Sequence, residues 1–384
     1  MDYYEKGDTQ ASSVDFFKYQ DQARRGTFRL SLLFILGVIL TVASVNLLIL
    51  GLFGINEDVP THGVDLLKSV APTILWTTSV TLLVIGIMAL YRIFSLNSGG
   101  GKVALELGGV LVPEDVREFA LRRYRNVVEE VALASSVPVP EIYILEHEQG
   151  INAFAAGNKP DNAAICVTRG ALDRLNREEL QAVIAHEFSH IANGDMRLNL
   201  RLVGVIFGIM GLGIIAGWTL RGAFRGRGGK NAIVIVVLGL ALMIIGLVGV
   251  FFGNLIKAGI NRQREYLADA SAVQFTRQSR GLEGALMKIA GIPEGARLTD
   301  HIDKAKEFDH MLFGKGVTSI FSTHPSIIKR IQRLNPSFDK EILNKMKDQW
   351  SIQPPNGYLE DIALGFATEA PDSCMETRGN FDMK

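Results

Sequence analysis

The sequence is poor in cysteine and has no excess of either charge. Its two cysteines, Cys166 and Cys374, lie far apart in the chain, which excludes a cysteine-pair metal site and argues against a disulfide framework. The 40 basic residues balance the 40 acidic residues in a chain of 384, so the charge does not suggest a nucleic acid as partner. No internal repeat is present. The glycine run Gly99-Gly100-Gly101 lacks the following GK[ST] of a phosphate-binding loop.

Charged residues are also missing from four long apolar blocks. The blocks are Leu30–Asn56, Ser69–Tyr91, Leu202–Leu220 and Asn231–Ile256. A helix rises ~1.5 Å per residue and the hydrocarbon layer is ~30 Å thick, so about 20 residues suffice to cross it. We therefore predict four transmembrane helices, the first an uncleaved anchor, with the lipid bilayer as a partner. The third block is the shortest and is rich in glycine. A shallow hairpin that never crosses is the alternative for the last two blocks.

The positions of Lys and Arg predict the orientation in the membrane. Basic residues precede the first block and follow the second and fourth blocks, whereas the segment from Glu57 to Lys68 is mainly acidic. The N-terminus and the region from Arg92 to Arg201 are therefore expected to face the cytoplasm. The loop between the third and fourth blocks disagrees, because it should lie outside yet carries four basic residues, Arg221, Arg225, Arg227 and Lys230.

The polar regions have mixed helical and strand patterns. Helices are predicted at Val116–Ser135, Asn176–Gly194, Asn261–Thr276, Leu282–Ile289 and Pro325–Leu334, and short strands at Ile142–Leu145, Asn152–Ala156 and Ala163–Val167. The chain thus divides into an N-terminal segment, a first membrane hairpin, a first polar part, a second membrane hairpin, a second polar part and a loose tail. Their ranges are 1–29, 30–93, 94–201, 202–256, 257–349 and 350–384.

The sequence His186-Glu187-Phe188-Ser189-His190 matches the H-E-x-x-H motif. Two histidines four positions apart lie on one face of a helix, so both imidazoles can bind one zinc ion. Glu187 lies beside this pair, where it can accept a proton from zinc-bound water. An amphipathic helix with two incidental histidines is the alternative.

A catalytic zinc normally takes three protein ligands and leaves one position for water. Glu265 is the strongest candidate for the third ligand. Asp269 lies one helical turn further on the same face, where it could fix the tautomer of a ligating histidine. An ordinary charged helix would show the same spacing. Two membrane blocks separate His190 from Glu265, and an even number of crossings returns the chain to the same side.

Four motifs in order resemble the HtpX-like branch of the membrane metallopeptidases, relatives of the CAAX prenyl endopeptidases. They are Ile151-Asn152-Ala153-Phe154-Ala155, His186 to His190 with Asn193-Gly194-Asp195, Glu265 to Asp269, and Ser322-Thr323-His324-Pro325 followed by Arg330-Ile331. The resemblance covers roughly Gly99 to Pro336. It implies a zincin-like (gluzincin) α+β domain facing the cytoplasm from a bacterial inner membrane, with one zinc per chain. The mainly α fold with a small sheet agrees with the predicted elements.

The resemblance also implies roles for single residues. His186, His190 and Glu265 would bind zinc, Glu187 would be the general base, and His324 would stabilise the oxyanion. Asp269 and Asp195 would support the ligands, and the segment Asn152, Ala153, Phe154, Ala155 would pair with the substrate backbone. An ordinary core strand fits that segment equally well. Arg330 could bind a substrate carboxylate, or pair with Asp269 or Glu187.

Three classes of function remain to be compared. The first is zinc-dependent endoproteolysis of misfolded or membrane-associated proteins. A membrane scaffold with a structural zinc is less favoured, because such sites usually have four protein ligands and no adjacent base. A transporter is disfavoured because the apolar blocks contain no charge, the usual sign of an ion path. The sequence does not predict an oligomeric state.

Overall fold

A computed structural model of the protein describes residues 15–54, 63–96, 99–225, 232–293, 295–296 and 324–368. Within these ranges, four helices are long and apolar enough to cross a membrane. They are α2 (Phe16–Gly54), α3 (Gly63–Leu96), α8 (Asp195–Arg225) and α9 (Ala232–Thr276). The four predicted spans are confirmed in this sense. Helices α8 and α9 are 31 and 45 residues long, so their length favours crossing over the shallow-hairpin alternative.

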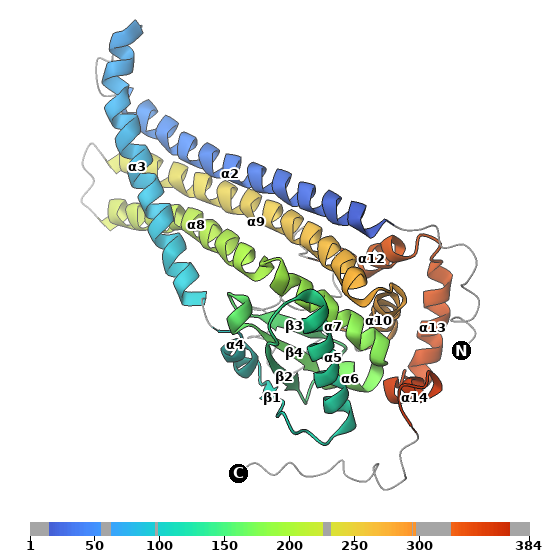
Figure 1. The fold of residues 1–384 in the computed structure, drawn as a ribbon. Coiled ribbons are helices and arrows are strands. Elements are labelled where there is room, and N and C mark those ends of the chain that lie inside the picture. The colour runs from blue at the N-terminus through green and yellow to red at the C-terminus, as the bar shows by residue number, and fades with distance from the viewer. Residues whose placement is uncertain are drawn as a thin grey trace.

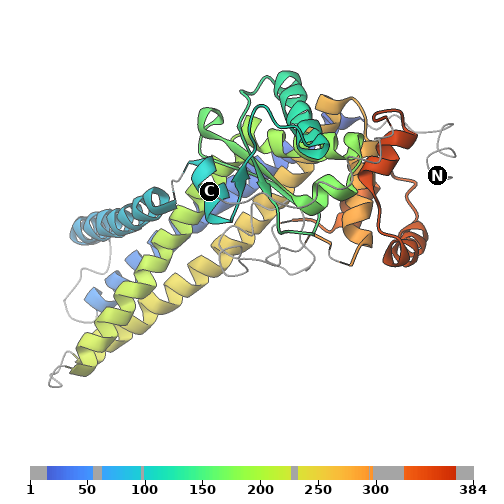
Figure 2. The ribbon, with the colours of Figure 1, turned by 90° about the horizontal axis from the view of Figure 1, so that it is seen from below.

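The long helices form one bundle that projects from the rest of the molecule. Helix α9 packs against both α2 and α8, and α3 crosses α8, as Figures 1 and 2 show. Three glycines of α8, Gly204, Gly208 and Gly211, lie against α3. A Cβ added at Gly208 would lie 2.4 Å from the backbone oxygen of Ile85 in α3, and one added at Gly246 in α9 would lie 3.0 Å from the nitrogen of Gly213. The glycine content of the third block therefore permits close helix packing.

Helices α2 and α9 extend well beyond their apolar blocks. At ~1.5 Å per residue, a helix of 45 residues is about twice as long as the hydrocarbon layer is thick. In the polar extension, the Gln20 side chain of α2 donates to the side chain of Gln274 in α9 at 2.8 Å. The segment predicted as a separate helix from Asn261 is thus the continuation of the fourth membrane helix.

A small mixed sheet, as predicted, lies at the end of the bundle. Its strands are β1 (Val110–Leu111), β2 (Glu141–Leu145), β3 (Ala153–Ala156) and β4 (Ala164–Thr168), in the order β1-β2-β4-β3. β2 and β4 are parallel, and the other pairs are antiparallel. Strand β3 therefore forms one edge of the sheet.

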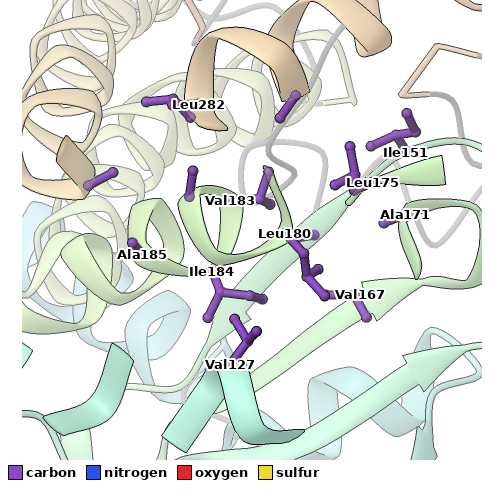
Figure 3. Close-up of a cluster of buried hydrophobic side chains, with 14 of the residues drawn as sticks. Val127, Ile151, Val167, Ala171, Leu175, Leu180, Val183, Ile184, Ala185 and Leu282 are labelled. Atoms are coloured by element: carbon purple, nitrogen blue, oxygen red, sulfur yellow. The ribbon is translucent and has the colours of Figure 1, made fainter. Parts of the chain in front are cut away.

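Helices cover both faces of the sheet. The main core lies between one face and the helices α5 (Phe119–Ser135) and α7 (Arg177–Ala192). Figure 3 shows this core, in which Leu180 and Ile184 of α7 approach Val127 of α5. The short helix α4 (Gly100–Glu106) packs on the opposite face. Two short elements, η1 (Pro160–Asn162) and α6 (Arg169–Arg174), flank β4.

Among its described residues, the C-terminal part adds four helices, α10 (Arg280–Gly291), α12 (Ile327–Leu334), α13 (Lys340–Ile352) and α14 (Gly357–Ala363). The prediction of a loose tail from residue 350 is therefore wrong for the described residues up to 368, which include the end of α13 and all of α14. Asp361 of α14 is fully buried, forms an ion pair with Arg123 of α5, and accepts a hydrogen bond from the backbone nitrogen of Arg177 at 2.7 Å. These contacts attach α14 to the start of α7. The rest of the predicted tail and residues 1–14 lie outside the described residues.

Replacing Asp361 by Ala is expected to destabilise the fold by about 3–5 kcal/mol, because it leaves the buried guanidinium of Arg123 without its carboxylate. The measurement is the thermal unfolding midpoint of the purified protein in detergent. Asp348→Ala, at an exposed position of α13, is the matched control and should leave the midpoint unchanged. A D361A midpoint equal to that of the wild type would show that α14 does not stabilise α7.

Candidate metal centre

The two motif histidines lie on the buried face of helix α7. Asn176 caps the helix, because its side chain accepts a hydrogen bond from the backbone nitrogen of Glu179. The Glu179 carboxylate in turn accepts a hydrogen bond from the backbone nitrogen of Asn176. The helix ends at Ala192, and Gly194 follows with a φ of +66°. The four-residue spacing places the Nε2 atoms of His186 and His190 3.2 Å apart.

Glu265 of α9 completes a triangle with these two nitrogens. Its Oε2 lies 3.6 Å from His186 Nε2, and its Oε1 lies 3.5 Å from His190 Nε2. One ligand atom from each of the three residues lies within 4.8 Å of the others. A tetrahedral zinc with bonds of ~2.0–2.1 Å separates its ligand atoms by about 3.4 Å. The three donors therefore fit one tetrahedral metal ion.

Both imidazoles are oriented through their other ring nitrogen. His186 Nδ1 lies 3.0 Å from Asp269 Oδ1, and His190 Nδ1 lies 2.7 Å from Asp195 Oδ2. The adjacent carboxylates favour the tautomer with the proton on Nδ1, and in that tautomer the two Nε2 atoms present lone pairs to each other and to Glu265. A cation placed between three groups that present lone pairs to one another would be favourably bound. This arrangement supports a metal ion on chemical grounds.

Arg330 of α12 contacts the carboxylates of the same cluster. Its side chain is 1% exposed, and its Nη2 and Nε donate to Asp269 at 2.6 and 2.9 Å. Its Nη1 is 3.6 Å from Glu265 Oε2. Of the three partners that the sequence allowed for Arg330, the structure brings it to Asp269. The neighbouring Arg333 lies over the rings of Tyr19 and Tyr266, at 4.8 and 4.0 Å, which holds α12 against α2 and α9.

Glu187 lies beside the donor triangle with one oxygen occupied and one available. Its Oε2 accepts a hydrogen bond from the Ala155 backbone nitrogen at 3.0 Å. Its Oε1 is buried and has no hydrogen-bond partner among the described residues. Burial raises the pKa of Glu187, and the charges of His190 and His186 oppose that rise. A buried carboxyl group with a raised pKa and one uncommitted oxygen is suited to accept and return a proton.

His324 also lies at the cluster, with its Nδ1 3.1 Å from Glu265 Oε2. The four residues Asn152 to Ala155 fall at or just before the edge strand β3, which is the position that pairing with a substrate backbone requires. Two of their side chains are committed elsewhere. The Asn152 amide donates to the Ala296 oxygen at 2.8 Å, and Phe154 packs in the core beneath α4.

Sequence reasoning missed one residue of the cluster, Arg264. It forms an ion pair with Asp195 and donates to the Asn193 backbone oxygen at 2.9 Å. Its position next to Glu265 was the available signal. Arginines that follow an apolar span are so common that adjacency alone does not indicate a role.

The chain is similar in sequence to known proteins. A family model described as peptidase family M48 matches residues 120–337. The protease HtpX homolog of Caldanaerobacter subterraneus subsp. tengcongensis is 42% identical over 241 residues, which is 61% of this chain and 77% of that protein. The protease HtpX homolog of Dictyoglomus thermophilum is 36% identical over 278 residues, 71% of this chain and 85% of that protein. The crystal structure of S. mikatae Ste24p aligns with a TM-score of 0.39 and 18% identity, over 80% of this chain and 66% of that one.

Proposed function

Because this chain belongs to peptidase family M48 and is a membrane metallopeptidase, we propose that it is a zinc-dependent endopeptidase with His186, His190 and Glu265 as the ligands of one zinc ion per chain. The observation that carries the proposal is the triangle of donor groups: the two Nε2 atoms lie 3.2 Å apart, Glu265 Oε2 lies 3.6 Å from His186 Nε2, and Glu265 Oε1 lies 3.5 Å from His190 Nε2. These distances and the N/O donor types suit zinc. Asp269 and Asp195 hold the imidazoles in the required tautomer.

When bound, zinc acidifies a water molecule and polarises the scissile carbonyl of the substrate. Glu187 takes the proton from the attacking water at Oε1, while its Oε2 stays fixed on the Ala155 amide. The protonated Glu187 then delivers this proton to the leaving amine nitrogen, which restores the carboxylate. His324, 3.1 Å from Glu265, adds a donor for the developing oxyanion. The outer edge of β3 aligns the substrate backbone. If Arg330 binds a substrate carboxylate, it does so while it remains paired with Asp269.

The proposed substrates are misfolded or membrane-associated polypeptides. Asp195, five residues after His190, begins the membrane helix α8, so the zinc lies close to the bilayer. The positions of Lys and Arg favour a cytoplasm-facing site in a bacterial inner membrane. A protease placed there meets the exposed cytoplasmic segments of damaged membrane proteins. Removal of such proteins is quality control.

The test is a comparison of new protein N-termini in membranes from cells that carry the wild type or Glu187→Gln. We expect cleavage products of membrane proteins in the wild-type sample that are absent with E187Q. If the two samples have the same products while both proteins contain zinc, the chain is a zinc-containing scaffold instead of a peptidase.

A further inference from the structure

Each imidazole of the metal centre is supported by a carboxylate, and each carboxylate by an arginine. In the first of these two relays, His186 Nδ1 contacts Asp269, and Asp269 pairs with Arg330. In the second relay, His190 Nδ1 contacts Asp195 Oδ2, and the other oxygen of Asp195 pairs with Arg264. The first relay joins α7 to α9 and α12, and the second joins α7 to α8 and α9.

The second relay is largely closed to water. The side chains of Asp195 and Arg264 are 11% and 13% exposed. Arg264 Nη2 also donates to the backbone oxygen of Asn193 at 2.9 Å. Arg264 therefore contacts both the turn that follows α7 and the carboxylate that contacts His190. Because it immediately precedes Glu265 in α9, it couples the third ligand to the second.

We propose that Arg264 is a positioning residue for the metal centre, and this rests on the metal site proposed above. Arg264 fixes the Asp195 carboxylate so that it holds the His190 ring with Nε2 facing the other donors. It also sets the distance between the C-terminal end of α7 and α9. Without the guanidinium, Asp195 loses its counter-charge and can rotate away from Nδ1, and His190 is then free to adopt other rotamers. The residue touches neither metal nor substrate.

The loss of an outer partner of a ligating histidine typically weakens metal affinity by about 10–100-fold. We expect a loss of this size for Arg264→Gln and a smaller one for Arg264→Lys. Lysine keeps a positive charge near Asp195, but it lacks the planar guanidinium whose Nη2 contacts both the Asp195 carboxylate and the Asn193 oxygen. Because the two residues act on His190 in series, Asp195→Asn combined with R264Q should cost no more affinity than the worse of the two single variants.

The experiment is a zinc titration of the purified, detergent-solubilised full chain against a competing chelator. It compares the wild type with R264Q, R264K, D195N, the double variant and Arg201→Gln, an exposed arginine of α8. Thermal unfolding of each metal-free protein is measured in parallel. The expected result is a 10–100-fold weaker zinc affinity for R264Q, partial recovery in R264K, no change in R201Q, and metal-free unfolding midpoints close to that of the wild type.

A zinc affinity of R264Q within about two-fold of the wild type would overturn the inference, and so would losses in R264Q and D195N that multiply in the double variant. A purely structural role would lower the metal-free unfolding midpoint and leave the affinity of the folded fraction unchanged. Failure of the proposed function has a different signature, since the wild type itself would then not bind one equivalent of zinc.

Discussion

The Glu187→Gln variant is expected to bind one zinc per chain and to cleave peptide bonds about 10²–10⁴-fold more slowly than the wild type, which is the range that a positioned general base contributes. Glutamine has nearly the same shape as glutamate. Its carbonyl oxygen can still accept the hydrogen bond from the Ala155 amide that Glu187 Oε2 accepts at 3.0 Å. The amide group at the position of Oε1 cannot take a proton from water. The fold and the donor triangle are therefore retained while the proton acceptor is lost.

The measurement is kcat on an unfolded protein substrate in detergent or vesicles, with zinc content determined on the same preparation. Glu178→Gln is the matched control, because it makes the same chemical change in the first turn of the same helix. It should cleave like the wild type. Cleavage by E187Q at the wild-type rate would show that Glu187 is not the proton acceptor.

The second large effect is expected at the third ligand. Glu265→Gln should weaken zinc binding by clearly more than the roughly 10–100-fold that the loss of an outer partner costs, and activity should fall with metal content. A neutral amide is a poor zinc ligand compared with a carboxylate. The change also removes the negative charge that His324 and Arg330 approach at 3.1 and 3.6 Å.

Asp269→Asn provides the comparison for that variant, because Asp269 lies one turn further along the same face of α9. It reaches His186 only at the outer ring nitrogen, and its other contact is the guanidinium of Arg330. The predicted order of zinc affinity is wild type, then D269N, then E265Q. If D269N loses as much zinc as E265Q or more, Glu265 is not a ligand and the triangle has been interpreted incorrectly.

Features that depend on local spacing could be predicted from the sequence. The i, i+4 spacing of His186 and His190, the cap at Asn176 and the length of the apolar blocks are each recorded in a few consecutive residues. The motif that contains Glu265 and Asp269 is likewise visible within a few consecutive residues. The even number of membrane crossings between His190 and Glu265 then left the two on one side, where the structure has them 3.5 Å apart.

Features that depend on distant partners could not be predicted. Helix α14 is short and polar, and its place is set by the pair of Asp361 with Arg123, which lies 238 positions away. The choice of Asp269 for Arg330 depends on how α12 packs against α9. The role of Arg264 depends on how α9 packs against the end of α7 and the start of α8. Ion pairs of this kind leave no periodic pattern in the sequence.

The central claim is that two histidines and one glutamate hold a catalytic zinc. The most direct measurement is the X-ray absorption spectrum at the zinc edge of the purified wild-type protein. We predict one zinc per chain whose nearest neighbours are only nitrogen and oxygen at ~2.0–2.1 Å, with two imidazoles among them. Sulfur among the neighbours at ~2.3 Å, or no bound zinc, would contradict the assignment of His186, His190 and Glu265.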